Sequence, residues 1–506
     1  MKKTLPLLCF AFLVFFSSCK TTKPVFNPEK KYSPEQLRRD YTLFRKILED
    51  CHPSLYWYTS KKDLDHYFDQ GYAQIRDSMD ELRFRAHLSY VISKIDCGHT
   101  SIRYSKKYTR YLDTTRAPQF PLVLKWWGDT LVVVANLNRR DSVLKRGVIL
   151  KSINGLSVAQ LRDTLFNYVV TDGYSSTGKY QTLSTGLNFG NWYTCVFGRQ
   201  DAYTIRFLDP QSAEQEVTIP NYDSRADSSR RDGGGRGRKA DSLHLRHVPE
   251  PGTKRRRQSD RFRSHEFQVD TSGHTAFMTL YTFAHGNHLR GFFRRSFKTL
   301  QRQRIPNLVI DVRSNGGGDA NLSTLLTRYL VDRPFKLADS LYAIKRHSQY
   351  DRYVEKSNLY HFLMLFVTHR EDDGRYHFGY FERHYFEPKE NHHFDGQVYI
   401  LIGGNSFSAT TLFAGSLKGQ HNVTLVGEET GGGAYGNTAW MIPDVELPNT
   451  GIRFRLPKFR LVIDQFREKD GRGVMPDVTV LPRADAISRG VDYKTEKVKE
   501  LIRSSK

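Results

Sequence analysis

The serine best placed for nucleophilic chemistry is Ser408, within the stretch QVYILIGGNSFSATTLFAGSLKG at 397–419. Residues 398–402 form an unbroken apolar run, which predicts a strand buried on both faces. Two glycines end this run, and residues 409–417 place apolar side chains at helical spacing. Ser408 is therefore expected at the N-terminus of a helix, where unpaired N–H groups can stabilise an oxyanion. Helix capping is the competing interpretation, and this stretch alone favours it because serine is a common cap.

A histidine in a second corner is the candidate general base. Residues 96–100 are Asp-Cys-Gly-His-Thr, between a helical pattern and a short strand pattern. Gly98 allows a tight turn beside the imidazole of His99, and functional side chains concentrate in such turns. A lone histidine is more often structural than catalytic, so this assignment depends on the rest of the chain.

A third corner rich in glycine follows another predicted buried strand. Residues 308–312 are apolar except for Asp311, 315–318 are Asn-Gly-Gly-Gly, and 322–331 have a helical pattern. The N–H groups of such a corner can point at an anion. A phosphate-binding loop is excluded because no Lys-Ser/Thr follows at the required spacing. The alternation of strands and helices predicts an α/β region with a largely parallel sheet.

Length and charge limit the classes of protein that the chain can represent. Its 506 residues allow two to four domains, and its formal net charge is +23. Residues 223–264 hold 13 Lys/Arg and 6 Asp/Glu, a net of +7, which leaves +16 spread thinly over the remaining chain. A diffuse excess indicates a basic surface, and no nucleic-acid-binding module is recognisable, so we expect no nucleic-acid partner. The 223–264 segment is predicted to be a disordered basic insert.

The N-terminus has the pattern of an export signal. Lys2 and Lys3 precede an apolar stretch at 5–16 that is too short for a comfortable membrane span. Ser-Ser-Cys then follows, which resembles the lipobox of a bacterial lipoprotein, with Cys19 as the lipidated residue. An ordinary secretory signal with an incidental cysteine is the alternative. The resemblance implies a lipid-anchored protein of the cell envelope that faces the periplasm, on the outer membrane.

The other cysteines give no disulfide framework and no metal signature, because they are odd in number and widely spaced. Cys9 would be removed with the predicted signal peptide, so these are Cys51, Cys97 and Cys195. The predicted domain boundaries are a signal peptide at 1–18, a tether at 19–32, an N-terminal helical region at 33–117, a second domain at 118–222, the insert at 223–264, an α/β core at 265–484 and a tail at 485–506.

The second domain resembles a PDZ domain. Its predicted strands, its Asn154-Gly155 turn of hairpin type and its following helix carry this resemblance. PDZ domains bind extended peptides by strand addition. A plain hairpin within a larger domain is the alternative.

Together these pieces resemble the C-terminal-processing peptidases, or tail-specific proteases, in their tricorn-core-like branch. The motifs are the 311–318 corner, Ser408 in Ser-Phe-Ser-Ala, and Gly-Arg-Gly-Val-Met-Pro-Asp at 471–477, which we name the closing motif. The resemblance extends over about 33–481, apart from the insert. It implies an α/β fold: a crotonase-like (ClpP/crotonase) catalytic core with a PDZ-like domain and an N-terminal helical region.

The resemblance also implies a Ser–His–acid triad. Ser408 matches the family's nucleophile, and His99 matches the histidine that the tricorn-like design takes from the N-terminal region. Asp470, directly before the closing motif, fits the acid best, although tricorn-type members have Glu there. Asp464 and Glu468 are near enough to remain alternatives.

The expected oxyanion hole consists of backbone N–H groups from Ala409 and from Gly316 or Gly317. The family's other design is a Ser–Lys dyad, whose lysine follows the nucleophile's helix. No lysine occurs at 426–437, and Lys418 is expected about 15 Å from the nucleophile at the far end of the helix. The sequence therefore favours the triad.

The function predicted by these patterns is a serine-type endopeptidase that hydrolyses exported proteins or peptides through an acyl-enzyme. No metal or organic cofactor is implied, and the oligomeric state is left open. The alternative is a non-catalytic lipoprotein that binds peptides or hydrophobic ligands on the same fold. A binder would not need the complete set of Ser408, His99 and an acid.

Overall fold

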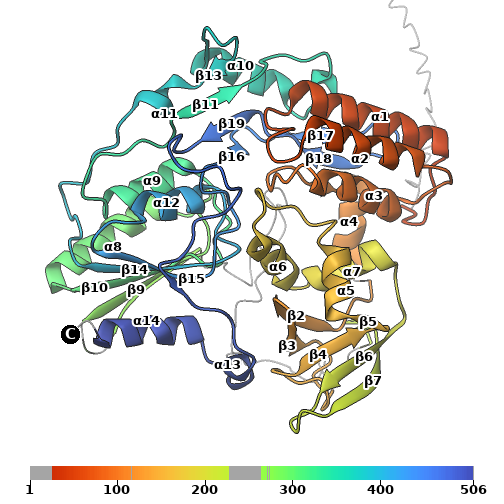
Figure 1. The fold of residues 1–506 in the computed structure, drawn as a ribbon, viewed down its shortest axis with the longest axis horizontal. Helices are drawn as coiled ribbons and strands as arrows, with labels where there is room; N and C mark the ends of the chain where they lie inside the picture. Colours follow the sequence, from red (N-terminus) through yellow and green to blue (C-terminus); the bar gives the residue numbers. More distant parts are fainter. Residues whose placement is uncertain (1–25, 116, 227–263, 271, 273, 505–506) are drawn as a thin grey trace, which may run out of the picture.

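The computed structural model describes residues 26–115, 117–226, 264–270, 272 and 274–504 (Figure 1). The predicted signal peptide, Cys19 and most of the predicted basic insert lie outside these residues. The chain is mixed α/β, as predicted, with red and orange helices at its start, a yellow β-rich unit, and a green-to-blue α/β region (Figure 1).

Three helices open the described chain: α1 (Pro34–Cys51), α2 (Lys61–Ala73) and α3 (Glu81–Ser93). Ser33 and Gln36 form a capping box at the start of α1, and the apolar face of this helix is buried. These helices also pack on β17 (Asp444–Glu446) and β18 (Arg453–Arg455), which pair with each other, and β18 also pairs with β1 (Ile102–Arg103). Strands from late in the chain therefore hold the N-terminal region, and with it His99, against the α/β region.

The next unit is an antiparallel sheet in the order β2-β3-β4-β6-β7. Its strands are β2 (Leu122–Trp127), β3 (Thr130–Asn136), β4 (Ile149–Ile153), β6 (Ala202–Leu208) and β7 (Glu214–Pro220). The predicted Asn154-Gly155 turn is confirmed: both residues have positive φ, and β5 (Leu156–Ser157) pairs back onto β4. Helices α5 (Val158–Leu165), α6 (Ser176–Ser184) and α7 (Asn188–Phe197) accompany the sheet.

The α/β region is built on a second sheet, in the order β20-β15-β14-β10-β9-β8. β9 (Thr275–Leu280), β10 (Asn307–Asp311), β14 (Gln397–Ile402), β15 (Val423–Gly427) and β20 (Val478–Thr479) are parallel, and β8 (His265–Val269) is antiparallel. One face packs on α8 (Leu289–Gln303), α9 (Ala320–Arg328) and α12 (Ala409–Leu417). The other face packs on α14 (Tyr493–Ser504). The central strands are thus buried on both faces, as their unbroken apolar runs predict.

Two features of this region differ from the sequence-based expectation. The predicted tail at 485–506 instead contributes α13 (Ala484–Arg489) and α14, whose Val498 and Ile502 are buried against the sheet. A separate lobe is also present, built from the chain between α9 and β14 together with β16 and β19, two strands that come later in the chain. Its sheet has the order β12-β13-β11-β19-β16, and its parts are β11 (Ser340–Ala343), α10 (Ser357–Val367), β12 (His369–Arg370), β13 (Tyr376–His377), α11 (Gly379–Arg383), β16 (Gly436–Ala439) and β19 (Phe459–Val462).

Within the described ranges, we find no helix that combines the length and the apolar character needed to span a bilayer.

Candidate functional site

Ser408 lies in a strained corner between β14 and α12. Its φ is +56° and its ψ is −123°, a region that non-glycine residues rarely adopt and that costs backbone energy. Ser408 is the N-terminal flanking residue of α12, yet its hydroxyl makes no capping hydrogen bond within the described part of the chain. The helix-capping interpretation is therefore wrong for this serine. Strain without a capping hydrogen bond is expected where the corner serves to present the side chain.

Two glycines allow the chain to pack closely around Ser408. A Cβ built on Gly317 would lie 2.8 Å from the Ser408 Cβ and 2.7 Å from the carbonyl oxygen of Phe407. A Cβ on Gly432 would lie 2.2 Å from the Thr411 Oγ1 and 3.2 Å from the Ser408 nitrogen. The glycine corner at 315–318 and the segment that contains Gly432 therefore both pack against the backbone of Ser408.

The predicted oxyanion donors differ in availability. The Gly317 N–H donates to the Asn315 Oδ1 at 2.9 Å, so it is occupied in this structure. The N–H groups of Gly316 and Ala409 have no acceptor among the residues that the structure describes. Ala409 follows Ser408 directly, and the neighbouring Gly317 packs on Ser408. Gly316 and Ala409 are thus the predicted pair that remains available.

His99 is brought to this corner from the N-terminal region. Its ring is buried, and its centroid lies 4.5 Å from that of Phe407, the residue before Ser408. Gly98 makes this approach possible, because a Cβ there would lie 2.6 Å from the Phe407 ring. On the other side of the turn, His52 Nε2 is 2.8 Å from the Thr100 Oγ1, which fixes the backbone after His99.

The carboxylate beside His99 belongs to Asp172, a residue that the sequence did not single out. Asp172 Oδ1 lies 3.7 Å from His99 Nδ1, with side-chain exposures of only 2% and 4% respectively. The same oxygen accepts the Gly98 N–H at 2.8 Å. Both ring nitrogens of His99 and the Asp172 Oδ2 are buried without a hydrogen-bond partner in the described chain. Such groups carry a desolvation cost, which is common at sites that bind a ligand or transfer protons.

The acids predicted from the closing motif lie elsewhere. Asp470 is exposed, and its carboxylate accepts the Arg472 N–H at 2.8 Å. Asp464 accepts the Phe466 N–H, and Glu468 is exposed. No described interaction links any of the three to His99. The assignment of Asp470 is therefore corrected: the structure places Asp172 against the imidazole.

Asp172 is held in place by a loop at 171–175 that contacts two other parts of the chain. The Gly173 N–H donates to the Asp96 carbonyl at 2.8 Å, which links the loop to the turn that contains His99. The Ser175 hydroxyl donates to the Thr430 carbonyl at 3.1 Å, which links it to the segment after β15. The loop thus fixes the acid relative to both the histidine turn and the α/β region.

The closing motif holds in place a segment that packs on Ser408. The Gly473 N–H and the Arg472 guanidinium both donate to the buried carboxylate of Glu429, at 2.8 and 2.7 Å. This fixes the chain just before Gly432, which packs on Ser408. The role of the motif is therefore to position the backbone around Gly432.

Lys418, the lysine considered for a dyad, is engaged elsewhere. It follows the last residue of α12, and its Nζ lies 2.7 Å from the Asp477 Oδ1. It does not provide a base for Ser408 in this structure.

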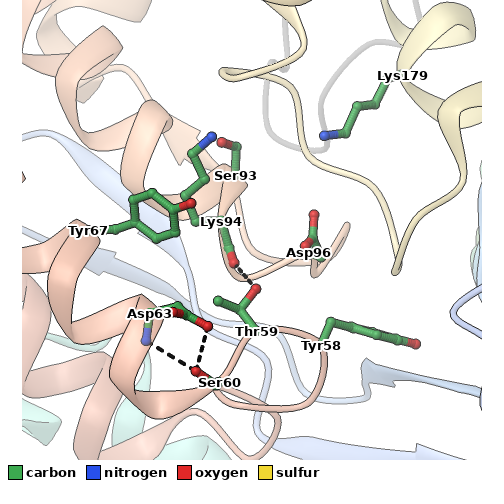
Figure 2. Close-up of a pocket in the computed structure, with 9 residues that line it drawn as sticks. All are labelled: Tyr58, Thr59, Ser60, Asp63, Tyr67, Ser93, Lys94, Asp96 and Lys179. Carbon is green, nitrogen blue, oxygen red and sulfur yellow. Dashed lines mark hydrogen bonds between the residues drawn. The ribbon is translucent and has the colours of Figure 1, made fainter.

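A polar cavity of about 320 Å³ lies beside the turn that contains His99 (Figure 2). Its wall includes Tyr58 from the loop after α1, Lys94 and Asp96 from the segment after α3, and Lys179 from α6. Burial raises the pKa of Asp96 to about 6 and lowers the pKa values of both lysines. The cavity therefore adds ionisable groups next to the histidine.

One group of side chains in the described chain could hold a metal ion, but it lies in the separate lobe. It consists of Glu371, His377 and Glu382. His377 is already bound by carboxylates, with Nδ1 2.8 Å from the Glu382 Oε1 and Nε2 3.2 Å from the Asp373 Oδ2. These contacts account for the group as a hydrogen-bond network.

Comparisons with known proteins identify what the chain is similar to. Residues 274–480 match the model of peptidase family S41. Mature CPAF is 17% identical with a TM-score of 0.62, covering 93% of this chain and 97% of that one. Mature CPAF complexed with lactacystin is 16% identical with a TM-score of 0.62, covering 93% of this chain and 98% of that one. The photosystem II D1 C-terminal processing protease is 15% identical with a TM-score of 0.41, covering 91% of this chain and 98% of that one. No curated protein matches the chain in sequence.

Proposed function

We infer that this chain, whose residues 274–480 match the model of peptidase family S41, is a serine-type endopeptidase that acts through an acyl-enzyme. The family match confirms the resemblance to C-terminal-processing peptidases, and S41 peptidases are serine hydrolases. The observation that carries the proposed mechanism is the strained Ser408, which is not used as a cap and lies directly after a residue in contact with the buried His99.

Acylation begins when His99 accepts the Ser408 hydroxyl proton while the oxygen attacks the scissile carbonyl carbon. The carbonyl oxygen becomes an oxyanion, which the N–H groups of Gly316 and Ala409 stabilise. Each such donor is worth on the order of 3 kcal/mol in the transition state. His99 then donates its proton to the leaving nitrogen, the C–N bond breaks, and an ester to Ser408 remains.

Deacylation uses the same groups in reverse. Water gives a proton to His99 and attacks the ester carbonyl, and the protonated histidine returns that proton to Ser408 as the acid product leaves. Asp172 orients the ring and stabilises the imidazolium that forms in both steps. Its 3.7 Å distance from His99 exceeds a hydrogen bond, but catalytic hydrogen bonds commonly tighten when substrate binds.

The other domains are proposed to present the substrate. We assign the β2–β7 unit as the PDZ-like domain, the parallel sheet with its helices as the crotonase-like core, and α1–α3 as the helical region that supplies His99. An extended peptide added to an edge of the PDZ-like sheet would be held by main-chain hydrogen bonds. Exported proteins or peptides are the proposed substrates.

We further propose that the protein is a lipoprotein anchored at Cys19, facing the periplasm from the outer membrane. The support is the charged start, the short apolar stretch and the Ser-Ser-Cys sequence. Mass spectrometry of the native N-terminus tests this, with a lipidated Cys19 expected. An unmodified Cys19 inside a longer mature chain would contradict it.

Labelling with a fluorophosphonate probe tests the catalytic proposal. We expect modification at Ser408 by peptide mapping, and complete loss of labelling in Ser408→Ala. Ser488→Ala, an exposed serine on α13, is the matched control and should label like the wild type. A folded wild-type protein that neither labels nor hydrolyses peptides, yet binds them, would instead support the non-catalytic alternative.

A further inference from the structure

Helix α10 exposes a broad apolar surface to solvent. Of its 11 residues, Met364 alone is buried. Five others are exposed by 38–73%, and we name them the α10 patch: Leu359, Phe362, Leu363, Leu365 and Phe366. Large apolar patches of this kind on a folded protein mark interaction sites.

The patch belongs to a helix that is fixed at both ends. Met364 packs in the core of the lobe. Arg346 donates from Nε to the Thr368 Oγ1 at 3.0 Å, and its guanidinium also binds the Thr368 carbonyl, just after the helix. Nearer the start, the His361 ring is stacked on that of His347. The exposed side chains are therefore presented by a supported helix.

The start of the described chain is connected to the chain just before α10 through α4. Phe26 packs against Tyr108 on α4 (Lys106–Thr115), with ring centroids 5.8 Å apart. Lys106, at the first turn of α4, pairs with Glu355 at 2.6 Å, two residues before α10 begins. In Figure 1, α10 lies at the upper edge of the view, whereas α13 and α14 lie in its lower half.

Cationic side chains flank the patch. Lys356 precedes α10 and Arg370 follows it, and both are exposed. Neither has an ion pair with another described residue. Anionic lipid headgroups attract cations placed next to an interfacial helix, whose apolar side chains enter the boundary of the acyl region.

We propose that the α10 patch docks on the surface of a membrane that contains anionic lipid. The location of Phe26 favours a bilayer over other partners. This part of the argument rests on the proposed lipid anchor: Cys19 is seven residues before Phe26, and seven residues span at most about 25 Å. An acyl chain at Cys19 would therefore keep the bilayer on the side of the molecule where α10 is exposed.

Vesicle flotation tests the proposal independently of the anchor. The mature chain carrying Cys19→Ser has no acyl chain, and we expect it to float with vesicles of phosphatidylcholine and phosphatidylserine more than with phosphatidylcholine alone. Phe366→Glu, at a side chain that is 73% exposed, should reduce the bound-to-free ratio at least about tenfold. Leu481→Glu is the control, because Leu481 is 56% exposed and lies three residues before α13.

Two further measurements test the role of the flanking cations and check that the variants remain folded. Lys356→Glu with Arg370→Glu should remove most of the preference for phosphatidylserine. Fluorophosphonate labelling of all variants should match the parent, which separates this inference from the proposed catalysis. The inference is overturned if the parent does not float, if Leu481→Glu loses as much binding as Phe366→Glu, or if light scattering shows a dimer that Phe366→Glu dissociates.

Discussion

Replacing Asp172 with asparagine tests the part of the mechanism that the structure assigns differently from the sequence. The carboxylate lies 3.7 Å from His99 Nδ1, and both side chains are buried. Two unit charges about 4 Å apart interact by about 4 kcal/mol at an effective dielectric constant of 20. If that energy stabilises the imidazolium in the transition state, its loss corresponds to about a 10³-fold decrease in kcat.

The substitution should leave the fold intact. Asparagine has the same shape, and its Oδ1 can still accept the Gly98 N–H that Asp172 Oδ1 accepts at 2.8 Å. We therefore expect a melting temperature within a few degrees of the wild type. The loss should appear in kcat with little change in KM, because the imidazolium forms only as the reaction proceeds.

The assay is steady-state hydrolysis of a fluorogenic peptide, with Asp470→Asn as the matched control. Asp470 is exposed and accepts only a local N–H from Arg472, so this variant should keep kcat within about twofold. A wild-type kcat in Asp172→Asn, together with a 10³-fold loss in Asp470→Asn, would refute the assignment and restore the acid beside the closing motif.

Three further outcomes follow from the site. Ser408→Ala and His99→Ala should each abolish peptide hydrolysis, and the double variant should be no less active than either single one, because triad members act as a unit. Lys418→Ala should retain wild-type kcat, since its Nζ pairs with Asp477; inactivity there, with an active His99→Ala, would restore a Ser–Lys dyad. Burial raises the folded-state pKa of Asp96 to about 6, so the native state binds more protons than the unfolded state between about pH 4 and 6, and stability falls as pH rises through that window. Asp96→Asn should therefore raise the melting temperature at pH 8 but not at pH 3, by an amount equivalent to about 3 kcal/mol; an equal change at both pH values would contradict the burial argument.

The nucleophile's corner could be predicted from sequence because its determinants are local. The short apolar run before Ser408 indicates a strand that is covered on both faces. The spacing of apolar residues after Ser408 indicates a helix. The prediction of a helix at 409–417 matches α12 residue for residue. The backbone strain at Ser408 and the packing of Gly432 against it have no local signal, since both arise from contact between segments.

The sequence did not distinguish between the two glycines that could donate to the oxyanion. The sequence offers Gly316 and Gly317 as equivalent, because neither has a side chain. The structure distinguishes them through Asn315, whose side chain accepts the Gly317 N–H. An asparagine two residues before a glycine is a familiar local motif, so this detail had a signal that could have been used.

The C-terminal helix α14 could also have been predicted from the spacing of its apolar residues. Tyr493, Val498, Leu501 and Ile502 lie close to helical spacing, and α14 covers one face of the parallel sheet. Composition obscured the pattern, because charged residues separate these side chains. A doubly covered sheet needs helices on both faces, and this requirement predicts a partner for the second face.

The acid illustrates why nearness in sequence is a poor guide to nearness in the site. The sequence favours Asp470 because it directly precedes the closing motif, and that motif does lie close to the corner that contains Ser408. It reaches the corner through Glu429, which binds the motif's backbone and so fixes the segment that packs on Ser408. The preceding residue has no part in that contact and remains exposed to solvent. Asp172 lies instead in the loop between α5 and α6, and its Oδ1 accepts the Gly98 N–H of the histidine turn. A contact of that kind is set by how two domains dock, so in a single sequence the acid of this site could be limited to a class of residue but not to a position.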